Sequence, residues 1–234
     1  MTGANKGIGF EVARQLGRVG MTVLLGVRNI KLGEESAAKL RAEGFDVHAI
    51  EVDLSREETI QDAAASIGEK YGRIDVLVNN AGINDAADGP PSTADPGSVR
   101  RVFETNFFGT LAVTQAMLPF VRKAEAGRIV NLSSGLGSLK WNGDPEWAFA
   151  PYKFIGYNGS KAALNMMTVQ LAYELRDTAI KVNSANPGFT ATDMNGHQGT
   201  QTVEEGAAET VRLALLPADG PTGGFFETGA IDPW

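Results

Sequence analysis

Short apolar runs alternate with amphipathic stretches along nearly the whole chain. The apolar runs predict strands at 22–28, 46–51, 74–78, 128–132, 180–185 and 223–227. Apolar residues that recur every three or four positions predict helices at 8–19, 30–43, 55–71, 98–124, 157–175 and 203–216. Alternation of strand and helix is typical of a parallel sheet with helices on both faces. We therefore expect an α/β fold with a doubly wound parallel sheet.

The length of 234 residues fits a single domain spanning residues 1–234. Its start is unusual, because only Met1 precedes the glycine-rich residues 2–9. Such a segment usually follows a buried strand in the middle of the sheet. We expect this first strand to be missing or truncated, by about six residues at usual strand lengths. Restoring an apolar strand ahead of Thr2 should then raise stability.

The composition narrows the possible functions. The net charge is −7 and the lysines and arginines are scattered, so we expect neither nucleic acid nor an anionic membrane surface as a partner. The absence of cysteine excludes disulfides, thiol catalysis and cysteine-based zinc sites. His48 falls in a predicted strand and His197 in a polar loop far from it in sequence, so we expect no metal site. Without a signal-peptide pattern or an apolar run of membrane-spanning length, we expect a cytoplasmic protein.

Three glycines precede the first predicted helix. Gly3, Gly7 and Gly9 are spaced G-x-x-x-G-x-G, and they allow a tight turn and a close backbone approach. The N-terminus of the following helix offers free N–H groups and a positive dipole to a phosphate. The spacing differs from the common G-x-G-x-x-G, and a plain glycine turn is the alternative.

Positive side chains at the next strand end bear on the choice of nucleotide. The strand at 22–28 ends in Arg28-Asn29, where an acidic residue would bind a ribose 2′-hydroxyl and an arginine would accommodate a 2′-phosphate. Together with Lys6 in the glycine segment, Arg28 favours NADP(H) over NAD(H). The alternative is that Arg28 is only a surface charge.

Two further strand ends carry polar residues. Asp53 could contact an adenine amine or cap its own loop, and the Ser55–Glu58 segment predicts a capping box for the helix that follows. The residues Asn79–Gly82 follow the strand at 74–78, where small residues let the backbone pass close to a ligand and asparagines can hold the turn. Asn106 lies inside a predicted helix although asparagine is a poor helix former. Either its side chain bonds a backbone carbonyl at a kink, or it faces a polar site.

A Y-x-x-x-K pattern, Tyr157 and Lys161, opens a long predicted helix and places both side chains on one face. A nearby cation would lower the tyrosine pKa toward the operating pH and make a usable general acid for carbonyl reduction. A solvated tyrosine–lysine pair is the alternative. The aromatic insertion at about 139–155 precedes this helix, and we expect it to form an apolar lid or pocket wall. A local mini-core is a compatible interpretation. The expected substrate-pocket residues are Trp141, Trp147 and Phe149.

Taken together, these motifs resemble the short-chain dehydrogenase/reductase family over essentially the whole chain. The matching residues are Thr2-Gly3-x-x-x-Gly7-x-Gly9, Asn79-Asn80-Ala81-Gly82, Asn106, Ser134, Tyr157-x-x-x-Lys161 and Pro187-Gly188. Within the family, the segments Gly3–Phe10, Asp75–Ile83 and Glu104–Thr110 are similar to NADPH-dependent carbonyl reductases. The resemblance implies a Rossmann-like fold and NADP(H) as cofactor.

The resemblance also implies residue roles. Tyr157 would protonate the carbonyl oxygen as hydride arrives from the nicotinamide, and Lys161 would bond the nicotinamide ribose and lower the tyrosine pKa. Ser134, with Ser133 as the fallback, would hydrogen-bond the carbonyl oxygen, and Asn106 would hold a water in a proton relay. The residues Pro187 to Thr192 would cover the nicotinamide carboxamide. The expected cofactor-binding residues are Gly3, Asn5, Lys6, Gly7, Ile8, Gly9, Arg28, Asn29, Asp53, Leu54, Asn80, Ala81, Gly82, Tyr157, Lys161, Pro187, Gly188, Phe189, Thr190 and Thr192.

We expect an NADPH-dependent oxidoreductase that reduces a small-molecule ketone or aldehyde, apolar or aromatic, to an alcohol. A non-catalytic NADP(H)-binding or sensor protein on the same fold is the alternative. A sugar epimerase or dehydratase fits less well, because those relatives use a different glycine spacing and a larger substrate domain. The interval between Ser134 and Tyr157 is longer than the family usually has. Carbonyl reductases with such insertions often lose oligomer contacts, so monomer and homo-oligomer both stay open.

Overall fold

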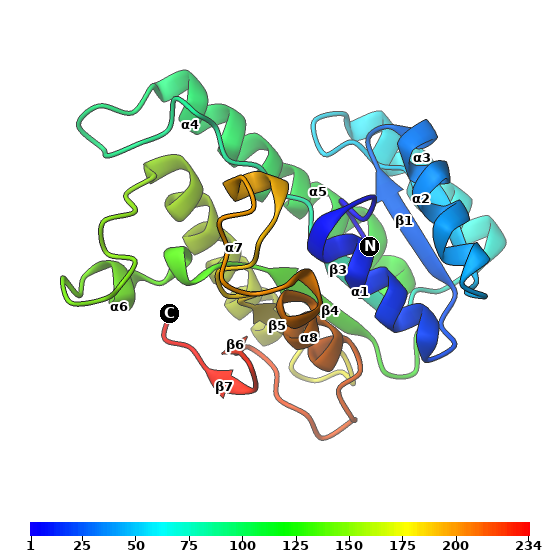
Figure 1. Cartoon of the computed structure of the whole chain (residues 1–234). Helices are drawn as coiled ribbons and strands as arrows, with labels where there is room; N and C mark the ends of the chain where they lie inside the picture. Colours follow the sequence, from blue (N-terminus) through cyan, green and yellow to red (C-terminus); the bar gives the residue numbers. More distant parts are fainter.

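A central layer of strands lies between two layers of helices (Figure 1) in the computed structural model, which describes residues 1–234. The strands are β1 (Val23–Val27), β2 (Val47–Glu51), β3 (Val76–Asn79), β4 (Arg128–Leu132), β5 (Lys181–Ala185), β6 (Phe225–Glu227) and β7 (Ala230–Ile231). The α-helices are α1 (Gly7–Arg18), α2 (Ile30–Ala42), α3 (Glu57–Lys70), α4 (Pro96–Phe103), α5 (Thr110–Val121), α6 (Leu139–Asn142), α7 (Ile155–Glu174) and α8 (Val203–Ala214). A π-helical turn, η1 (Glu104–Gly109), and two 3-10 turns, η2 (Gly135–Gly137) and η3 (Asp193–Asn195), complete the fold.

The strands form two ladders with the order β1-β2 and β3-β4-β5-β6-β7. All pairs are parallel except β6 and β7, which are antiparallel. Thr2 joins the two ladders: it bridges to Gly26 of β1, and its N–H donates to the Val78 carbonyl of β3 at 3.0 Å. The position expected for a first strand is thus filled by Met1 and Thr2 alone. The doubly wound, Rossmann-like fold with a parallel central sheet is confirmed.

Alternation of side chains along the strands produces two separate cores. Leu77, Ile129 and Val182 are register partners on β3, β4 and β5, and they point into the core beneath α3, α5 and α7. Their neighbours Val78 and Val130 point the other way, into the core beneath α1, α2 and α8. A strand buried on both faces needs apolar residues at nearly every position, which is why these strands appear as continuous apolar runs in the sequence.

The structure departs from the expected elements in three places. The helix expected at 98–124 is interrupted by η1, which divides it into α4 and α5. The expected capping box is wrong: α3 begins at Glu57, and its N-cap residue Arg56 makes no side-chain cap hydrogen bond. The short antiparallel strand β7 lies beyond the last predicted strand, because a two-residue element is too short to produce a hydrophobic pattern.

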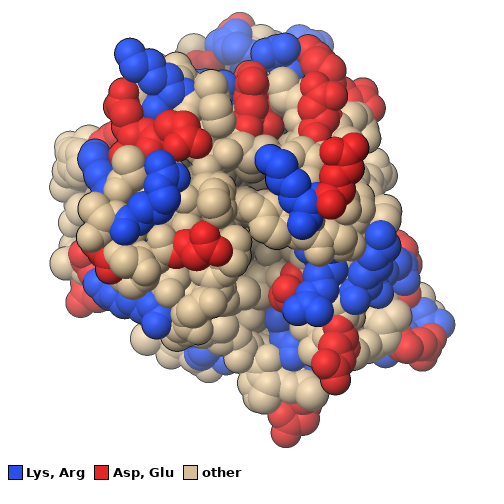
Figure 2. All heavy atoms as spheres, turned by 90° about the vertical axis from the view of Figure 1, so that its right-hand side faces the viewer, with Lys and Arg blue, Asp and Glu red and all other residues tan.

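The surface carries mixed charge. On the face formed by β1, α2 and α3, lysines and arginines are interspersed with aspartates and glutamates (Figure 2). None of the helices is both long enough and apolar enough to cross a lipid bilayer.

Candidate active site

The expected site residues follow the carboxyl ends of β1 to β5, and parallel pairing brings these ends to one edge of the sheet (Figure 1). Loops at this edge bind ligands in doubly wound folds. The segments concerned begin at Arg28, Asp53, Asn80, Ser133 and Asn186.

The glycine segment forms a tight cradle. Gly3 and Gly7 have φ values of 63° and 56°, a conformation that favours glycine. A Cβ at Gly9 would lie 2.5 Å from Asn80 Nδ2, and this Nδ2 donates to the carbonyls of Thr2 and Gly3 at 3.0 and 2.9 Å. The helix α1 begins at Gly7 without a side-chain cap, so its first-turn N–H groups are available to an anion. The cradle therefore suits a phosphate group.

Other predicted cofactor residues in this region have internal roles. Asn29 caps α2 by accepting from Leu32 N–H at 3.2 Å. Ala81 N–H donates to Thr2 Oγ1 at 3.1 Å, and the Asn5 carbonyl accepts from Ser36 Oγ at 2.9 Å. The side chain of Leu54 is buried in the core, so only its backbone could face a cofactor, whereas the side chain of Ile8 packs against the core and stays partly exposed.

The two cations expected at a 2′-phosphate differ in their surroundings. The side chain of Arg28 is exposed and makes no ion pair. Lys6 Nζ lies 2.6 Å from Asp193 Oδ2, in the loop that follows β5. Arg28 is therefore free to accept an anion, whereas Lys6 would have to leave Asp193 or share it.

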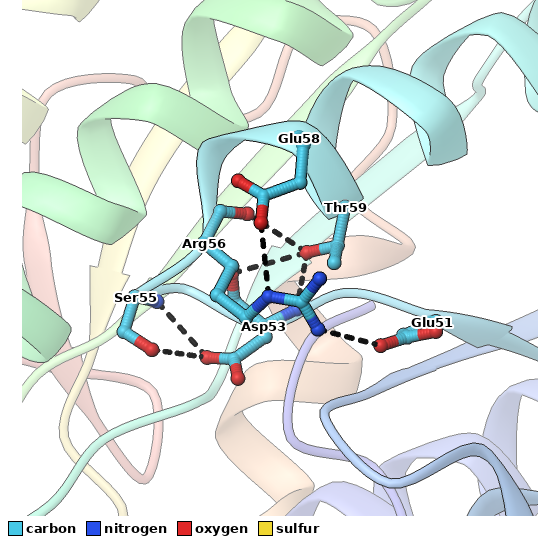
Figure 3. A network of polar contacts seen from close by, with 6 residues as sticks. All are labelled: Glu51, Asp53, Ser55, Arg56, Glu58 and Thr59. Carbon is cyan, nitrogen blue, oxygen red and sulfur yellow. Dashed lines mark hydrogen bonds and ion pairs between the residues drawn. The ribbon is translucent and has the colours of Figure 1, made fainter.

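Asp53 caps its own loop. Its Oδ1 accepts from the N–H of Ser55 at 3.0 Å and from Ser55 Oγ at 2.7 Å, while its own N–H donates to Thr59 Oγ1 at 2.9 Å (Figure 3). The structure thus shows the loop cap, made through Oδ1, and the contact of Asp53 with an adenine amine stays a prediction. The expected capping box does not form, because α3 begins at Glu57 and its N-cap residue is Arg56 and not Ser55.

Tyr157 and Lys161 lie on the same face of α7, with Lys161 Nζ 5.7 Å from the centroid of the Tyr157 ring. Lys161 is buried, and its Nζ donates to the Leu132 carbonyl of β4 at 2.7 Å. Burial lowers the pKa of Lys161 to about 8. Burial also raises the pKa of the Tyr157 hydroxyl, while a hydrogen bond with Ser134 acts in the opposite direction. The expected lowering of the tyrosine pKa by Lys161 is absent here, because the ammonium is directed to Leu132.

The two serines after β4 point in different directions. Ser133 is buried and donates to Asn165 Oδ1 of α7 at 2.6 Å. Ser134 Oγ accepts from the N–H of Leu136 at 3.2 Å, and it acts on the Tyr157 hydroxyl to lower its pKa, an effect that Ser133 does not have. The geometry thus favours Ser134 over Ser133 as the partner of the tyrosine.

Asn106 occupies the π-helical turn η1 and is 1% exposed. Its Oδ1 accepts from the Ile83 N–H at 2.8 Å, and its Nδ2 donates to the Ile83 carbonyl at 2.9 Å and to Ser160 Oγ at 3.0 Å. A Cβ added at Gly82 would lie 3.5 Å from Asn106 Oδ1 and 3.4 Å from Lys161 Nζ. Both interpretations of Asn106 therefore apply, since it bonds the backbone at an irregular turn and lies beside the polar site.

The loop after β5 is folded tightly on itself. Gly188 has a φ of 66°, and its N–H donates to Asn186 Oδ1 at 3.1 Å. Thr190 is buried and donates to the Pro187 carbonyl at 2.8 Å, whereas Thr192 caps η3. The side chain of Thr190 therefore supports the loop, and its role in binding the cofactor stays a prediction.

Aromatic rings link the insertion to this loop. Trp141 stacks on Trp147 with ring centroids 5.3 Å apart, Trp147 meets Phe149 at 5.5 Å, and Phe149 meets Phe189 at 5.7 Å. Trp141 also packs over Gly135, where a Cβ would lie 2.9 Å from its ring, next to Ser134. The rings thus form a continuous wall from Ser134 to the loop after β5.

One polar residue near the site, Asp88, was not predicted from the sequence. Asp88 lies in the loop between β3 and α4, and its carboxylate accepts hydrogen bonds from the N–H groups of Gly156 and Tyr157. No local pattern could identify this contact, because the partners are 68 and 69 positions apart in the chain.

Comparison with known proteins shows the same architecture. The short-chain dehydrogenase family model matches residues 1–202. The short-chain dehydrogenase anuI of Penicillium roqueforti is 37% identical over 220 residues, covering 92% of this chain and 86% of that protein. Mouse carbonyl reductase [NADPH] 1 is 32% identical over 272 aligned positions, covering 100% of this chain and 97% of that protein. The NADPH-bound carbonyl reductase from chicken fatty liver superposes with a TM-score of 0.87 at 27% identity, covering 100% of this chain and 92% of that one. The chain therefore belongs to the short-chain dehydrogenase family of oxidoreductases and resembles its carbonyl reductases.

Proposed function

We propose that this chain reduces an apolar ketone or aldehyde to an alcohol with NADPH as hydride donor and Tyr157 as general acid. The observation that carries the proposal is the convergence of Tyr157, Ser134, Lys161 and Asn106 at one edge of the sheet. Similarity to mouse and chicken carbonyl reductases supports the reaction class and the cofactor.

The residues present fit a phosphorylated dinucleotide. The cradle of Gly3, Gly7 and Gly9 with the open N-terminus of α1 would hold the pyrophosphate. The exposed guanidinium of Arg28 at the end of β1 would bind the 2′-phosphate, with no acidic residue beside it to favour a free 2′-hydroxyl. The narrow passage at Gly82, between Asn106 and Lys161, would admit the nicotinamide ribose without a side chain in the way.

NADPH bound here would supply the hydride that adds to the carbonyl carbon. Tyr157 gives its phenolic proton to the carbonyl oxygen, and Ser134 holds that oxygen by a hydrogen bond. Because burial raises the pKa of Tyr157, the phenol carries its proton at neutral pH, which is the form that a reduction needs. Lys161 would bind the nicotinamide ribose, and it would favour the tyrosinate left after proton transfer only once its ammonium turns from the Leu132 carbonyl.

The aromatic wall indicates the substrate class. Trp141 borders Ser134, and the rings of Trp147, Phe149 and Phe189 continue from it without a charged side chain between their faces. Flat apolar surfaces of this kind bind apolar or aromatic molecules by burial and stacking. We therefore propose a cyclic or aromatic carbonyl compound as the small-molecule partner.

Fluorescence titration with NADPH and NADH, followed by a panel of aromatic and alicyclic ketones and aldehydes, tests the proposal. We expect tighter binding of NADPH than of NADH and turnover with part of the panel. Tyr157→Phe should abolish turnover and leave NADPH binding nearly unchanged. Tyr173→Phe is the matched control, because Tyr173 lies on the same helix and is 69% exposed. Full turnover by Tyr157→Phe would refute the mechanism. NADPH binding without any turnover would favour a cofactor-binding or sensor protein.

A further inference from the structure

The first turn of the helix that carries Tyr157 is capped from another part of the chain. The N-cap residue of α7, Phe154, has no side chain that could cap it. Three first-turn N–H groups are instead bound by the loop between β3 and α4. Asp88 Oδ1 accepts from Gly156 at 2.9 Å, Asp88 Oδ2 accepts from Tyr157 at 2.8 Å, and the Gly89 carbonyl accepts from Ile155 at 2.9 Å.

The approach of this carboxylate depends on a glycine. A Cβ at Gly156 would lie 2.9 Å from Asp88 Oδ2 and 3.2 Å from Oδ1, which is closer than side-chain atoms normally come. Gly156 lies within α7 and does not have a positive φ, so its backbone conformation does not require glycine. Alanine is normally preferred to glycine inside a helix. Close contact with Asp88 therefore explains why glycine occupies this position.

The capping loop is itself anchored beside the active site. Its first residue, Ile83, is held through both backbone polar groups by Asn106. Asp85 pairs with Arg101 of α4 at 2.8 Å, and its carbonyl accepts from the Asp88 N–H at 3.0 Å. A single short segment, residues 83–89, thus links Asn106 to the backbone of Tyr157.

The carbonyl end of the same tyrosine is tied to the same network. Ser160 Oγ donates to the Tyr157 carbonyl at 2.8 Å and accepts from Asn106 Nδ2 at 3.0 Å. The backbone N–H of Tyr157 is held by Asp88 and its carbonyl by Ser160. The two contacts fix the start of α7 against the loop on one side and against η1 on the other.

We propose that Asp88 is a positioning residue of this enzyme, which fixes Tyr157 relative to Asn106 and Ser134 by capping α7. The inference rests on the proposed function, because it assigns Asp88 to the reaction that Tyr157 performs. Both carboxylate oxygens of Asp88 bind the backbone of α7, so Asp88 acts through Tyr157. A small displacement of a catalytic group can reduce the rate by up to about 10²-fold, so loss of this cap should lower kcat strongly.

The test compares Asp88→Ala, Asp88→Asn and Gly156→Ala with Asp95→Ala as matched control. Asp95 caps the neighbouring helix α4 by accepting from the Ser98 N–H at 2.7 Å, and α4 carries no catalytic residue. We expect Asp88→Ala to lower kcat about 10- to 100-fold while the Kd for NADPH stays within about twofold. Asp88→Asn keeps one of the two acceptor oxygens and should fall between wild type and Asp88→Ala. Asp95→Ala should lower thermal stability without a comparable loss of kcat.

Gly156→Ala separates positioning from stability. It displaces the carboxylate but adds a better helix former, so kcat should fall although the helix gains propensity. The double variant of Asp88→Ala and Gly156→Ala should be no slower than Asp88→Ala alone, because both changes break the same contact. Unchanged kcat in Asp88→Ala, or equal losses in Asp88→Ala and Asp95→Ala, would overturn the proposal.

Hydrogen exchange gives a readout that does not need turnover. The amides of residues 155–157 should exchange faster in Asp88→Ala than in wild type or Asp95→Ala. If wild type shows no reductase activity but this exchange difference appears, the proposed function fails and the cap stands. If activity is present and the exchange is unchanged, the positioning role is wrong.

Discussion

Replacing Lys161 with methionine should change how folding stability depends on pH. The Lys161 side chain is 3% exposed and its ammonium has one hydrogen-bond acceptor, the Leu132 carbonyl. Burial lowers its pKa from 10.5 to about 8, so the folded protein releases this proton more easily than the unfolded chain does. Methionine is similar in length and apolar, and it removes the charge with little change in packing.

The magnitude follows from the pKa difference. At about 1.4 kcal/mol per pKa unit, the difference corresponds to about 3 kcal/mol of unfavourable charging in the folded state. Below about pH 8 this penalty is fully present. Between about pH 8 and pH 10.5 the folded state binds fewer protons than the unfolded state, so wild-type stability rises with pH relative to the variant. The free energy of unfolding of wild type should rise by about 2–3 kcal/mol relative to that of Lys161→Met between about pH 7 and pH 10.

Urea denaturation of both proteins at several pH values measures this difference. Lys39→Met, at an exposed position of α2, serves as control. Its free energy of unfolding should differ from that of wild type by the same amount at every pH. At neutral pH the net effect is smaller, because the variant leaves the Leu132 carbonyl without its donor at a cost of about 1–3 kcal/mol. A constant difference in the free energy of unfolding between wild type and Lys161→Met across the pH range would refute the reasoning. The variant should also be inactive as a reductase.

Three further predictions concern pH and the glycine cradle. Because burial raises the pKa of Tyr157, and because Lys161 keeps its charge well below its pKa of about 8, kcat for carbonyl reduction should stay constant from about pH 5 to pH 7, whereas alcohol oxidation should accelerate with pH. A reduction rate that falls over this range would contradict the assignment. Burial, followed by the charge of Asp232, raises the pKa of Glu227, so the folded state holds this proton after the unfolded chain has released it. The stability of wild type should therefore fall relative to that of Glu227→Gln as the pH rises from about 4 to 7. A constant difference in melting temperature between the two proteins would argue against this prediction. Gly9→Ala places a Cβ 2.5 Å from Asn80 Nδ2 and should cost about 1–3 kcal/mol in urea denaturation and weaken NADPH binding, whereas Gly143→Ala, with its nearest contact at 3.4 Å, should do neither.

The hydrophobic pattern predicted the larger elements, because the positions they bury must be apolar and this shows in the neighbouring residues of the sequence. Leu77 and Val78 point to different cores, and both must be apolar, so the strand appears in the sequence as a continuous run. In α1 the buried residues Val12 and Leu16 are four positions apart, and this helical spacing of apolar residues is also visible in the sequence. The motif residues at strand ends came together because parallel strands end at one edge.

Polar contacts between distant parts of the chain could not be predicted from the sequence. Ser55 has the spacing of a helix cap, but α3 begins one residue too late for Ser55 to be its N-cap, and local spacing cannot show where the helix starts. The spacing of Tyr157 and Lys161 places both on one helix face, yet it cannot show that Leu132 takes the ammonium or that burial dominates the tyrosine pKa. The cap from Asp88 likewise depends on how two distant segments fold together.

The π-helical turn at Asn106 also sets the rotational phase of the segments on either side of it. A π turn holds one residue more than an α turn, so α5 is rotated relative to a straight continuation of α4. This offset lets Phe103 of α4 reach α7 at Gly159 while Val113 and Met117 of α5 point into the core beneath the sheet. Deleting one residue from the turn would regularise the helix but rotate α4 by about 100°, the angle per residue of an α-helix. The irregularity therefore allows one continuous helical segment to pack against two partners that a regular helix could not face together.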